Sequence, residues 1–150
     1  MILSGRDLKW YIETGKLKIE GVELSQFQQN GIDIVLGSAE RTQLDKGGFC
    51  LATTREYFEM PDDLVALVGL RSTWARKGLS NLGPTWVDAG FHGEITLEIA
   101  SWVKQTLPIG EPFAHLVFMR TTTPAEPYRG KYQGQRGITA SLPDPPKGDV

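Results

Sequence analysis

Short apolar segments separated by turn sequences constrain the fold of this chain more than any other feature. Runs rich in Ile, Val, Leu, Phe and Thr occupy residues 32–36, 49–54, 64–70, 94–103 and 113–119. Turns rich in Gly, Pro and Asp lie between them, at 45–48, 60–63 and 107–110. This pattern is typical of antiparallel strands in a sandwich or barrel, and no strand–helix–strand rhythm favours a Rossmann-type sheet. We therefore predict a mainly β fold.

One short helix is predicted at the N-terminus. Ser4 can cap it, Asp7 follows three residues later, and Leu8 and Tyr11 recur at helical spacing. Gly15 supplies the stop.

Length and composition indicate one domain, residues 1–150. A chain of 150 residues buries roughly two thirds of the surface that its unfolded form exposes, which is enough for one core. No internal repeat or linker divides it. Residues 128–150 are rich in Gly, Gln, Pro and Lys and are predicted to form a mobile tail.

Charge and cysteine content exclude several classes of partner. The net charge of −2 and the pI near 5.7 provide no basic field for a nucleic acid. Cys50 is the only cysteine, so an internal disulfide and a multi-cysteine metal site are excluded. No apolar run approaches the roughly 20 residues needed to cross a bilayer. We predict a cytoplasmic protein without a membrane partner.

Residues 71–76 place two arginines beside two hydroxyl side chains. The segment Arg71-Ser72-Thr73-Trp74-Ala75-Arg76 follows an apolar run, and a helical turn there would place Ser72 and Arg76 on one face. Cations and free N–H groups at the start of a turn suit phosphate oxygens. An ordinary surface turn explains the same pattern, and both interpretations remain open.

Carboxylates alternate with apolar residues in the run 93–99. A strand there would place Glu94 and Glu98 on one face, with Ile95, Leu97 and Ile99 on the other. The plain interpretation is a solvated sheet face. However, the apolar continuation after Glu98 indicates that this end is the more buried one. A partly buried carboxylate has a raised pKa and can exchange a proton near neutral pH.

Several common catalytic motifs are missing. His92-Gly93-Glu94 imitates the H-x-E of zinc-dependent nucleobase deaminases, but the P-C-x-x-C pair that such sites need is absent. A zinc deaminase is therefore excluded. The chain also lacks a P-loop and a nucleophile elbow. His115, inside the apolar run 113–118, is interpreted as a core or interface histidine.

The tail segment 130–137 offers a cation, amides and an aromatic ring on a glycine-rich backbone. It is either a disordered end or a lid that becomes ordered over a bound ligand and excludes water.

Taken in order and spacing, several segments resemble the dCTP deaminases, which share their fold with the trimeric dUTPases. The matching segments are 1–17, Asn30-Gly31-Ile32-Asp33-Ile34-Val35-Leu36-Gly37, Arg71–Arg76, Asp88–Glu98 and Lys131-Tyr132-Gln133-Gly134-Gln135-Arg136-Gly137. They span nearly the whole chain, and the variant is closest to the archaeal type.

The resemblance implies a distorted jelly-roll or β-barrel of the dUTPase-like type with a short N-terminal helix. It also implies a homotrimer with active sites at subunit interfaces. The expected reaction is deamination of dCTP to dUTP and ammonia without zinc. Mg²⁺ is expected on the triphosphate rather than on protein side chains. Inhibition by dTTP is left open.

The resemblance also implies roles for individual residues. Glu98 would activate a water molecule and shuttle protons, while Ser72 and Arg76 would contact the nucleotide, orient that water and stabilise the tetrahedral intermediate. Asp88 would accept a hydrogen bond from the 3′-hydroxyl of the deoxyribose. The positions that match triphosphate ligands are Arg71, Thr73, Tyr128, Lys131 and Gln135.

Two departures from the deaminase pattern keep alternatives open. The segment 79–85 is shorter than in many bacterial deaminases and has the length found in dUTPases. His115 stands where dUTPases and bifunctional deaminases tend to carry glutamine. The second interpretation is a dUTP pyrophosphatase, alone or following deamination in the same site. The third is a nucleotide-sensing or trimer-forming protein without chemistry, against which the joint presence of Ser72, Arg76, Asp88 and Glu98 argues.

Overall fold

The computed structural model describes residues 1–83 and 85–146, so Pro84 of the segment 79–85 and residues 147–150 of the predicted tail lie outside the described residues. The elements follow one another as α1 (Gly5–Glu13), β1 (Lys18–Glu20), η1 (Leu24–Gln26), β2 (Phe27–Gln28), β3 (Gly31–Ala39), β4 (Gln43–Leu44), β5 (Phe49–Glu59), β6 (Leu64–Leu70), α2 (Ser72–Ala75), β7 (Leu79–Asn81), β8 (Thr85–Val87), β9 (His92–Ser101), β10 (Gln105–Thr106) and β11 (Pro112–Arg120).

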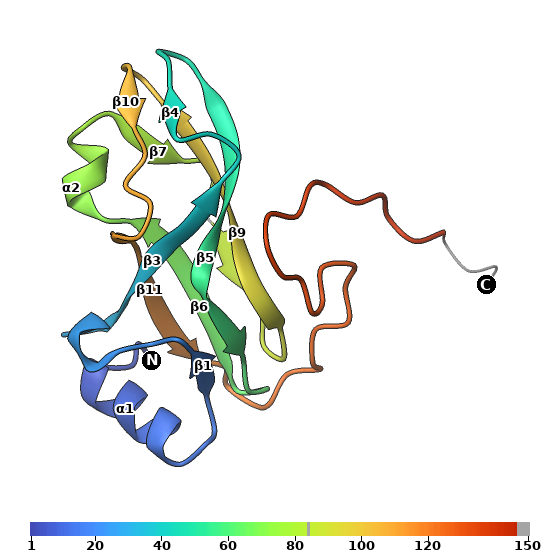
Figure 1. Cartoon of the computed structure of the whole chain (residues 1–150). Helices are drawn as coiled ribbons and strands as arrows, with labels where there is room; N and C mark the ends of the chain where they lie inside the picture. The colour runs from blue at the N-terminus through green and yellow to red at the C-terminus, as the bar shows by residue number, and fades with distance from the viewer. Residues whose placement is uncertain (84, 147–150) are drawn as a thin grey trace.

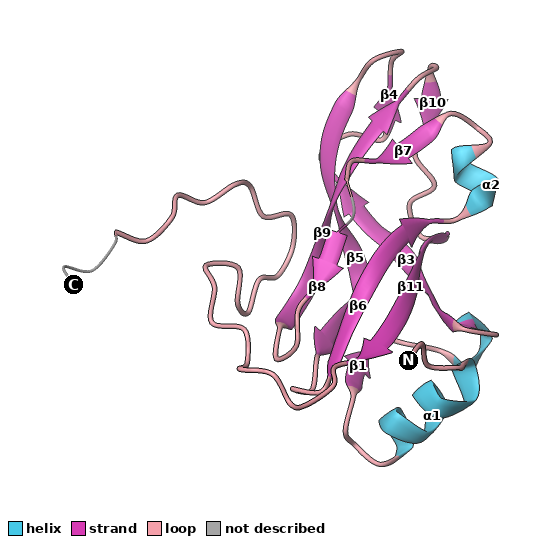
Figure 2. Ribbon diagram, turned by 180° about the vertical axis from the view of Figure 1, so that it is seen from behind, coloured by secondary structure: helices cyan, strands magenta, loops and turns pink. Residues whose placement is uncertain are grey.

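The main sheet is antiparallel and follows the order β7-β9-β5-β3-β11-β6-β8, with β1 added to β5 and β2 added to β3. Figures 1 and 2 show this sheet curled on itself, with α1 at one end. The two strands that end the order, β7 and β8, are close in sequence because β7 ends at Asn81 and β8 begins at Thr85. So short a connection keeps the two edge strands of the sheet near each other. The predicted mainly β, barrel-like fold is confirmed.

The N-terminal helix forms as its capping pattern predicts. The Ser4 side chain accepts a hydrogen bond from the Asp7 backbone N–H at 3.2 Å. Leu8 and Tyr11 are buried against the sheet, and Gly15 adopts a positive φ just after the helix ends. No helix within the described ranges has the length and apolar character needed to cross a bilayer.

Strand β9 shows the expected alternation. Ile95, Leu97 and Ile99 lie in the core, whereas Glu94, Thr96 and Glu98 are partly exposed on the other face. The strand ends at Ser101, so the predicted continuation to Val103 is wrong. The Ser101 hydroxyl and the Val103 carbonyl form a hydrogen bond across a turn, which leaves Trp102 and Val103 exposed.

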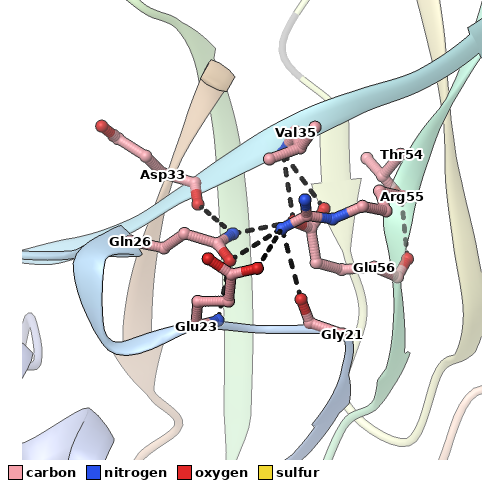
Figure 3. Close-up of polar contacts among 8 residues, drawn as sticks. All are labelled: Gly21, Glu23, Gln26, Asp33, Val35, Thr54, Arg55 and Glu56. Carbon is pink, nitrogen blue, oxygen red and sulfur yellow. Dashed lines mark hydrogen bonds and ion pairs between the residues drawn. The ribbon is translucent and has the colours of Figure 1, made fainter. Parts of the chain in front are cut away.

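A buried carboxylate ties η1 to β3 and β5 (Figure 3). Glu56 is fully buried, and both of its oxygens accept hydrogen bonds from the Val35 backbone N–H, at 3.1 and 3.2 Å. Gln26 donates to Glu56 Oε1 at 2.7 Å and to the Asp33 carbonyl at 2.9 Å. Arg55 Nη2 lies 3.5 Å from the same Glu56 oxygen. This network fixes the segment before β2 against the sheet.

The burial of Glu56 predicts a pH effect on stability. Burial raises the pKa of Glu56, although its hydrogen bonds and Arg55 oppose the shift. The contribution of this carboxyl to stability is therefore complete below its unfolded pKa and is lost as the pH rises through its folded pKa. Above about pH 4, the usual pKa of a glutamate, the free energy of unfolding of Glu56→Gln should fall less with rising pH than that of the wild type. Urea unfolding at a series of pH values measures this, and identical slopes would contradict it.

Candidate active site

Within the described residues, side chains link β8 to β9 beside the short connection from β7 to β8. Asn81 Oδ1 accepts a hydrogen bond from the Glu98 backbone N–H at 3.1 Å, and Asn81 Nδ2 donates to Thr85 Oγ1 at 3.1 Å. The Thr85 hydroxyl in turn lies 3.4 Å from Glu98 Oε2. Because β8 and β9 are not paired by backbone hydrogen bonds, we call this place the seam of the sheet.

A cavity of about 560 Å³ opens at the seam. This volume is within the usual range of small-molecule binding sites. Aromatic and aliphatic side chains form much of its wall, and polar groups converge on it. The lining residues are Phe49, Leu51, Thr85, Trp86, Val87, Asp88, Phe91, Ile95, Thr96, Glu98, Tyr128, Tyr132, Gln135, Thr139 and Ser141. Four residues predicted from sequence for the site thus share one cavity: Glu98, Asp88, Tyr128 and Gln135.

Glu98 has the electrostatic setting of a proton-transfer group. Burial raises the pKa of Glu98 above its usual value, while its own backbone N–H and the Thr85 hydroxyl oppose the shift. A carboxyl group with a raised pKa holds or releases a proton more readily near neutral pH than an exposed one.

A tight turn after β8 places Asp88 at the cavity. Gly90 has φ of 76°, and a Cβ on it would lie 2.6 Å from the Pro127 side chain. Only glycine therefore fits between the turn and the C-terminal segment. The Tyr128 backbone N–H donates to the Ala89 carbonyl at 2.8 Å, and the Tyr128 ring meets Phe91 edge to face. This contact seats the beginning of the tail beside Asp88.

The tail continues along the start of β9 and closes one side of the cavity. Gln135 forms a parallel bridge with Gly93, and its carbonyl accepts from the Glu94 backbone N–H at 2.9 Å. Its side chain donates to the Glu94 carbonyl at 2.7 Å. In this structure the tail is thus docked on its own chain.

Glu94 is a side-chain anchor of the docked tail. Its Oε2 accepts from the Gly137 backbone N–H at 2.6 Å and from the Thr53 hydroxyl at 3.2 Å. Arg136 lies 3.9 Å from Glu94 Oε1 and stacks on the Tyr57 ring at 4.0 Å. Sequence reasoning placed Glu94 on the correct face but assigned it no role.

Removing this anchor should loosen the tail around Gly137. We expect Glu94→Ala to speed hydrogen exchange of the Gly137 amide by roughly tenfold or more, because a hydrogen bond to a charged group contributes about 1.5–3 kcal/mol. Hydrogen-exchange mass spectrometry of the peptides covering 133–139 measures it. Glu59→Ala is the matched control, since Glu59 pairs only with the exposed Lys18 among the described residues. Unchanged exchange in Glu94→Ala would show that the anchor lies elsewhere.

The predicted helical turn forms at α2, but its side chains lie away from the cavity of the same chain. Arg76 Nε donates to Ser72 Oγ at 3.1 Å, so the two side chains do share a face. None of Arg71, Ser72, Thr73 and Arg76 is among the described residues that line the cavity. Figures 1 and 2 both show α2 on the opposite side of the sheet from the C-terminal segment.

Arg71 and His115 are held by one buried carboxylate. Asp33 Oδ2 lies 3.1 Å from Arg71 Nε, and Asp33 Oδ1 lies 2.9 Å from His115 Nδ1. Arg71 also donates to the Pro112 carbonyl at 3.2 Å. The contacts orient the Arg71 side chain beside α2, and His115 is a partly buried, hydrogen-bonded histidine.

Lys131 lies outside the cavity wall. Its ammonium group lies 2.8 Å from the exposed Asp144 carboxylate, which raises the pKa of Lys131. To bind a phosphate, Lys131 would have to leave this partner.

Comparison with known proteins identifies relatives over nearly the whole length. Residues 38–121 match the family model described as dCTP deaminase-like. A dCTP deaminase of Hyperthermus butylicus is 43% identical over 177 aligned positions, which cover 96% of this chain and 100% of that protein. A probable deoxyuridine 5′-triphosphate nucleotidohydrolase of Sulfolobus islandicus rod-shaped virus 1 is 42% identical over 159 positions, with the same coverage.

Solved structures support the fold. A 2′-deoxycytidine 5′-triphosphate deaminase from Agrobacterium tumefaciens superposes with a TM-score of 0.66 at 19% identity, covering 78% of this chain and 47% of that chain. The EIAV dUTPase superposes with a TM-score of 0.56 at 20% identity, covering 77% and 98%. At such identities the likeness concerns the fold alone.

Proposed function

The chain belongs to the dCTP deaminase-like family, and from this we infer that it is an enzyme that hydrolyses dCTP to dUTP and ammonia. The observation that carries the proposal is the partly buried Glu98 carboxylate in a cavity that also contains Asp88. A base with a raised pKa that shares a cavity with a second carboxylate is suited to binding a nucleoside and transferring protons on it.

In the proposed mechanism the Glu98 carboxylate takes a proton from a water molecule, and the resulting hydroxide attacks C4 of cytosine. Glu98 passes that proton to N3, which gives a tetrahedral intermediate. The carboxylate then takes the proton of the new C4 hydroxyl and delivers it to the amino group. The C4–N4 bond breaks, and ammonia and the uracil carbonyl form. Zinc is not required, because hydrogen-bond donors can stabilise the intermediate.

We propose that those donors come from another copy of the chain. Ser72 and Arg76 form a preorganised pair on α2, but they do not line the cavity of their own chain within the described residues. In a homotrimer, α2 of one subunit would face the cavity of its neighbour. Such an arrangement places an uncharged donor and a guanidinium beside the developing oxyanion.

The remaining assignments concern the nucleotide. Asp88 would accept a hydrogen bond from the 3′-hydroxyl of the deoxyribose. Its place in the cavity wall supports this role. Tyr128 and Gln135 lie in the same wall, whereas the triphosphate positions Arg71, Thr73 and Lys131 lie outside it.

Mg²⁺ would accompany the triphosphate. It prefers oxygen ligands and commonly binds substrate phosphates and water. We therefore propose that the ion is held by phosphate oxygens and water rather than by protein side chains. We also propose a cytoplasmic location, which suits the free, buried Cys50.

Product analysis tests the proposal directly. Purified protein incubated with dCTP and Mg²⁺ should release ammonia and accumulate dUTP. Anion-exchange chromatography separates the nucleotides and measures the dUTP formed. A preparation that binds dCTP without forming a uracil nucleotide would contradict it.

A dUTP pyrophosphatase activity is the second candidate. The alignment with the viral nucleotidohydrolase needs fewer gaps than that with the deaminase, since it extends over 159 rather than 177 positions at similar identity. In the same assay this activity would convert dUTP into dUMP and pyrophosphate.

A further inference from the structure

The seam contains a directed chain of hydrogen bonds that ends on Glu98. The Glu98 backbone N–H can only donate, so the Asn81 atom facing it must be the side-chain oxygen. The Asn81 amide nitrogen therefore faces Thr85 and donates to its hydroxyl oxygen. With that oxygen acting as acceptor, the single Thr85 hydroxyl proton is free to point at Glu98 Oε2, 3.4 Å away.

The same loop also holds the main chain of Glu98. The Leu82 backbone N–H donates to the Glu98 carbonyl at 2.8 Å, while Asn81 accepts from the Glu98 N–H. Both backbone groups of Glu98 are thus bonded to the segment 79–85. Asn81 and Leu82 thus support the strand that carries the carboxylate.

We propose that Thr85, oriented by Asn81, is a positioning residue that binds Glu98 Oε2 and leaves Oε1 as the oxygen that exchanges protons with the attacking water. The inference deepens the proposed deaminase function and rests on it. It assigns the short segment 79–85 a role at the catalytic carboxylate, besides any contact with the base. Thr85 itself is not proposed to exchange protons with the substrate.

Two substitutions at Thr85 distinguish the effect of its hydroxyl group from the effect of its packing. Thr85→Val keeps the branched shape and removes the hydrogen bond, whereas Thr85→Ser keeps the hydroxyl. Thr106→Val, on β10 and outside the cavity, controls for a general effect of this exchange. The other titratable side chains in the cavity wall, Asp88, Tyr128 and Tyr132, remain in place in every variant.

The first measurement does not require turnover. The pKa of the Glu98 carboxyl is followed by ¹³C NMR, and its signal is assigned by its loss in Glu98→Gln. A hydroxyl that donates to a carboxylate stabilises the charged form, so Thr85→Val should raise this pKa above that of the wild type, while Thr85→Ser and Thr106→Val should not. An unchanged pKa in Thr85→Val would overturn the inference whether or not the protein is a deaminase.

The second measurement is the pH profile of kcat for dCTP deamination. Thr85→Val should lower kcat roughly tenfold to a hundredfold at neutral pH, with the acid limb of the profile moved to higher pH and KM little changed. Thr85→Ser should restore most of the rate. If the wild type is active and Thr85→Val has the same pH profile of kcat, only the positioning role is overturned. If the wild type is inactive but Thr85→Val shows the expected rise in the pKa of Glu98, only the proposed reaction is contradicted.

Discussion

Glu98→Gln is expected to lower kcat for dCTP deamination by roughly a thousandfold or more, because an amide cannot take a proton from water or deliver one to the leaving ammonia. The substitution is nearly isosteric, and the amide oxygen can still accept the hydrogen bond from Thr85. Nucleotide binding should therefore change little. Steady-state kinetics and calorimetric titration with dCTP measure the two quantities separately.

Glu111→Gln is a suitable control, since Glu111 is exposed and lies outside the cavity wall. It should leave kcat and the dissociation constant unchanged. Should Glu98→Gln turn over as fast as the wild type, Glu98 is not the proton shuttle. A loss of binding together with turnover would instead indicate that the carboxylate holds the substrate.

Two inactive variants should restore activity when they are assembled together. In a trimer that combines Glu98→Gln chains with Arg76→Ala chains, some sites join an intact cavity to an intact α2 from a neighbour. With equal expression and random mixing, roughly a quarter of the sites would be complete. Co-expression with two affinity tags, followed by sequential purification and an ammonia assay, measures the recovery.

A pair of variants within one cavity gives the matched control. Glu98 and Asp88 line the cavity of the same chain, so co-assembly of Glu98→Gln with Asp88→Ala should restore nothing. Recovery in this control, or its absence in the first mixture despite a trimer in light scattering, would contradict the interface proposal. A protein that stays monomeric would contradict it as well.

Much of the fold follows from local sequence patterns. Each predicted strand is present in the structure. A short run of alternating or continuous apolar residues between two turns can bury its side chains most readily as a strand. The end of β9 was misplaced because Trp102 and Val103 are apolar yet exposed, and no local signal reveals what faces them. The closeness of β7 and β8 also escapes sequence reasoning, because it depends on how the whole sheet curls.

The candidate site was predictable in its residue types and less so in its geometry. Glu98 and Asp88 do share a cavity, but Ser72 and Arg76 lie elsewhere, since the motif order contains no information about which copy supplies each group. The roles of Asn81 and Thr85 were missed. A polar pair on two short strands that flank a glycine is a common turn pattern, and only the third partner, Glu98, gives it meaning.

The seam lowers the cost of opening the sheet locally. Around most of the main sheet, neighbouring strands share ladders of backbone hydrogen bonds, whereas β8 and β9 meet through side chains. Opening there breaks no ladder of backbone hydrogen bonds between β8 and β9, so it should cost less free energy than unfolding. The Glu98 carboxylate therefore lies at a boundary of the sheet that can open at lower cost than global unfolding.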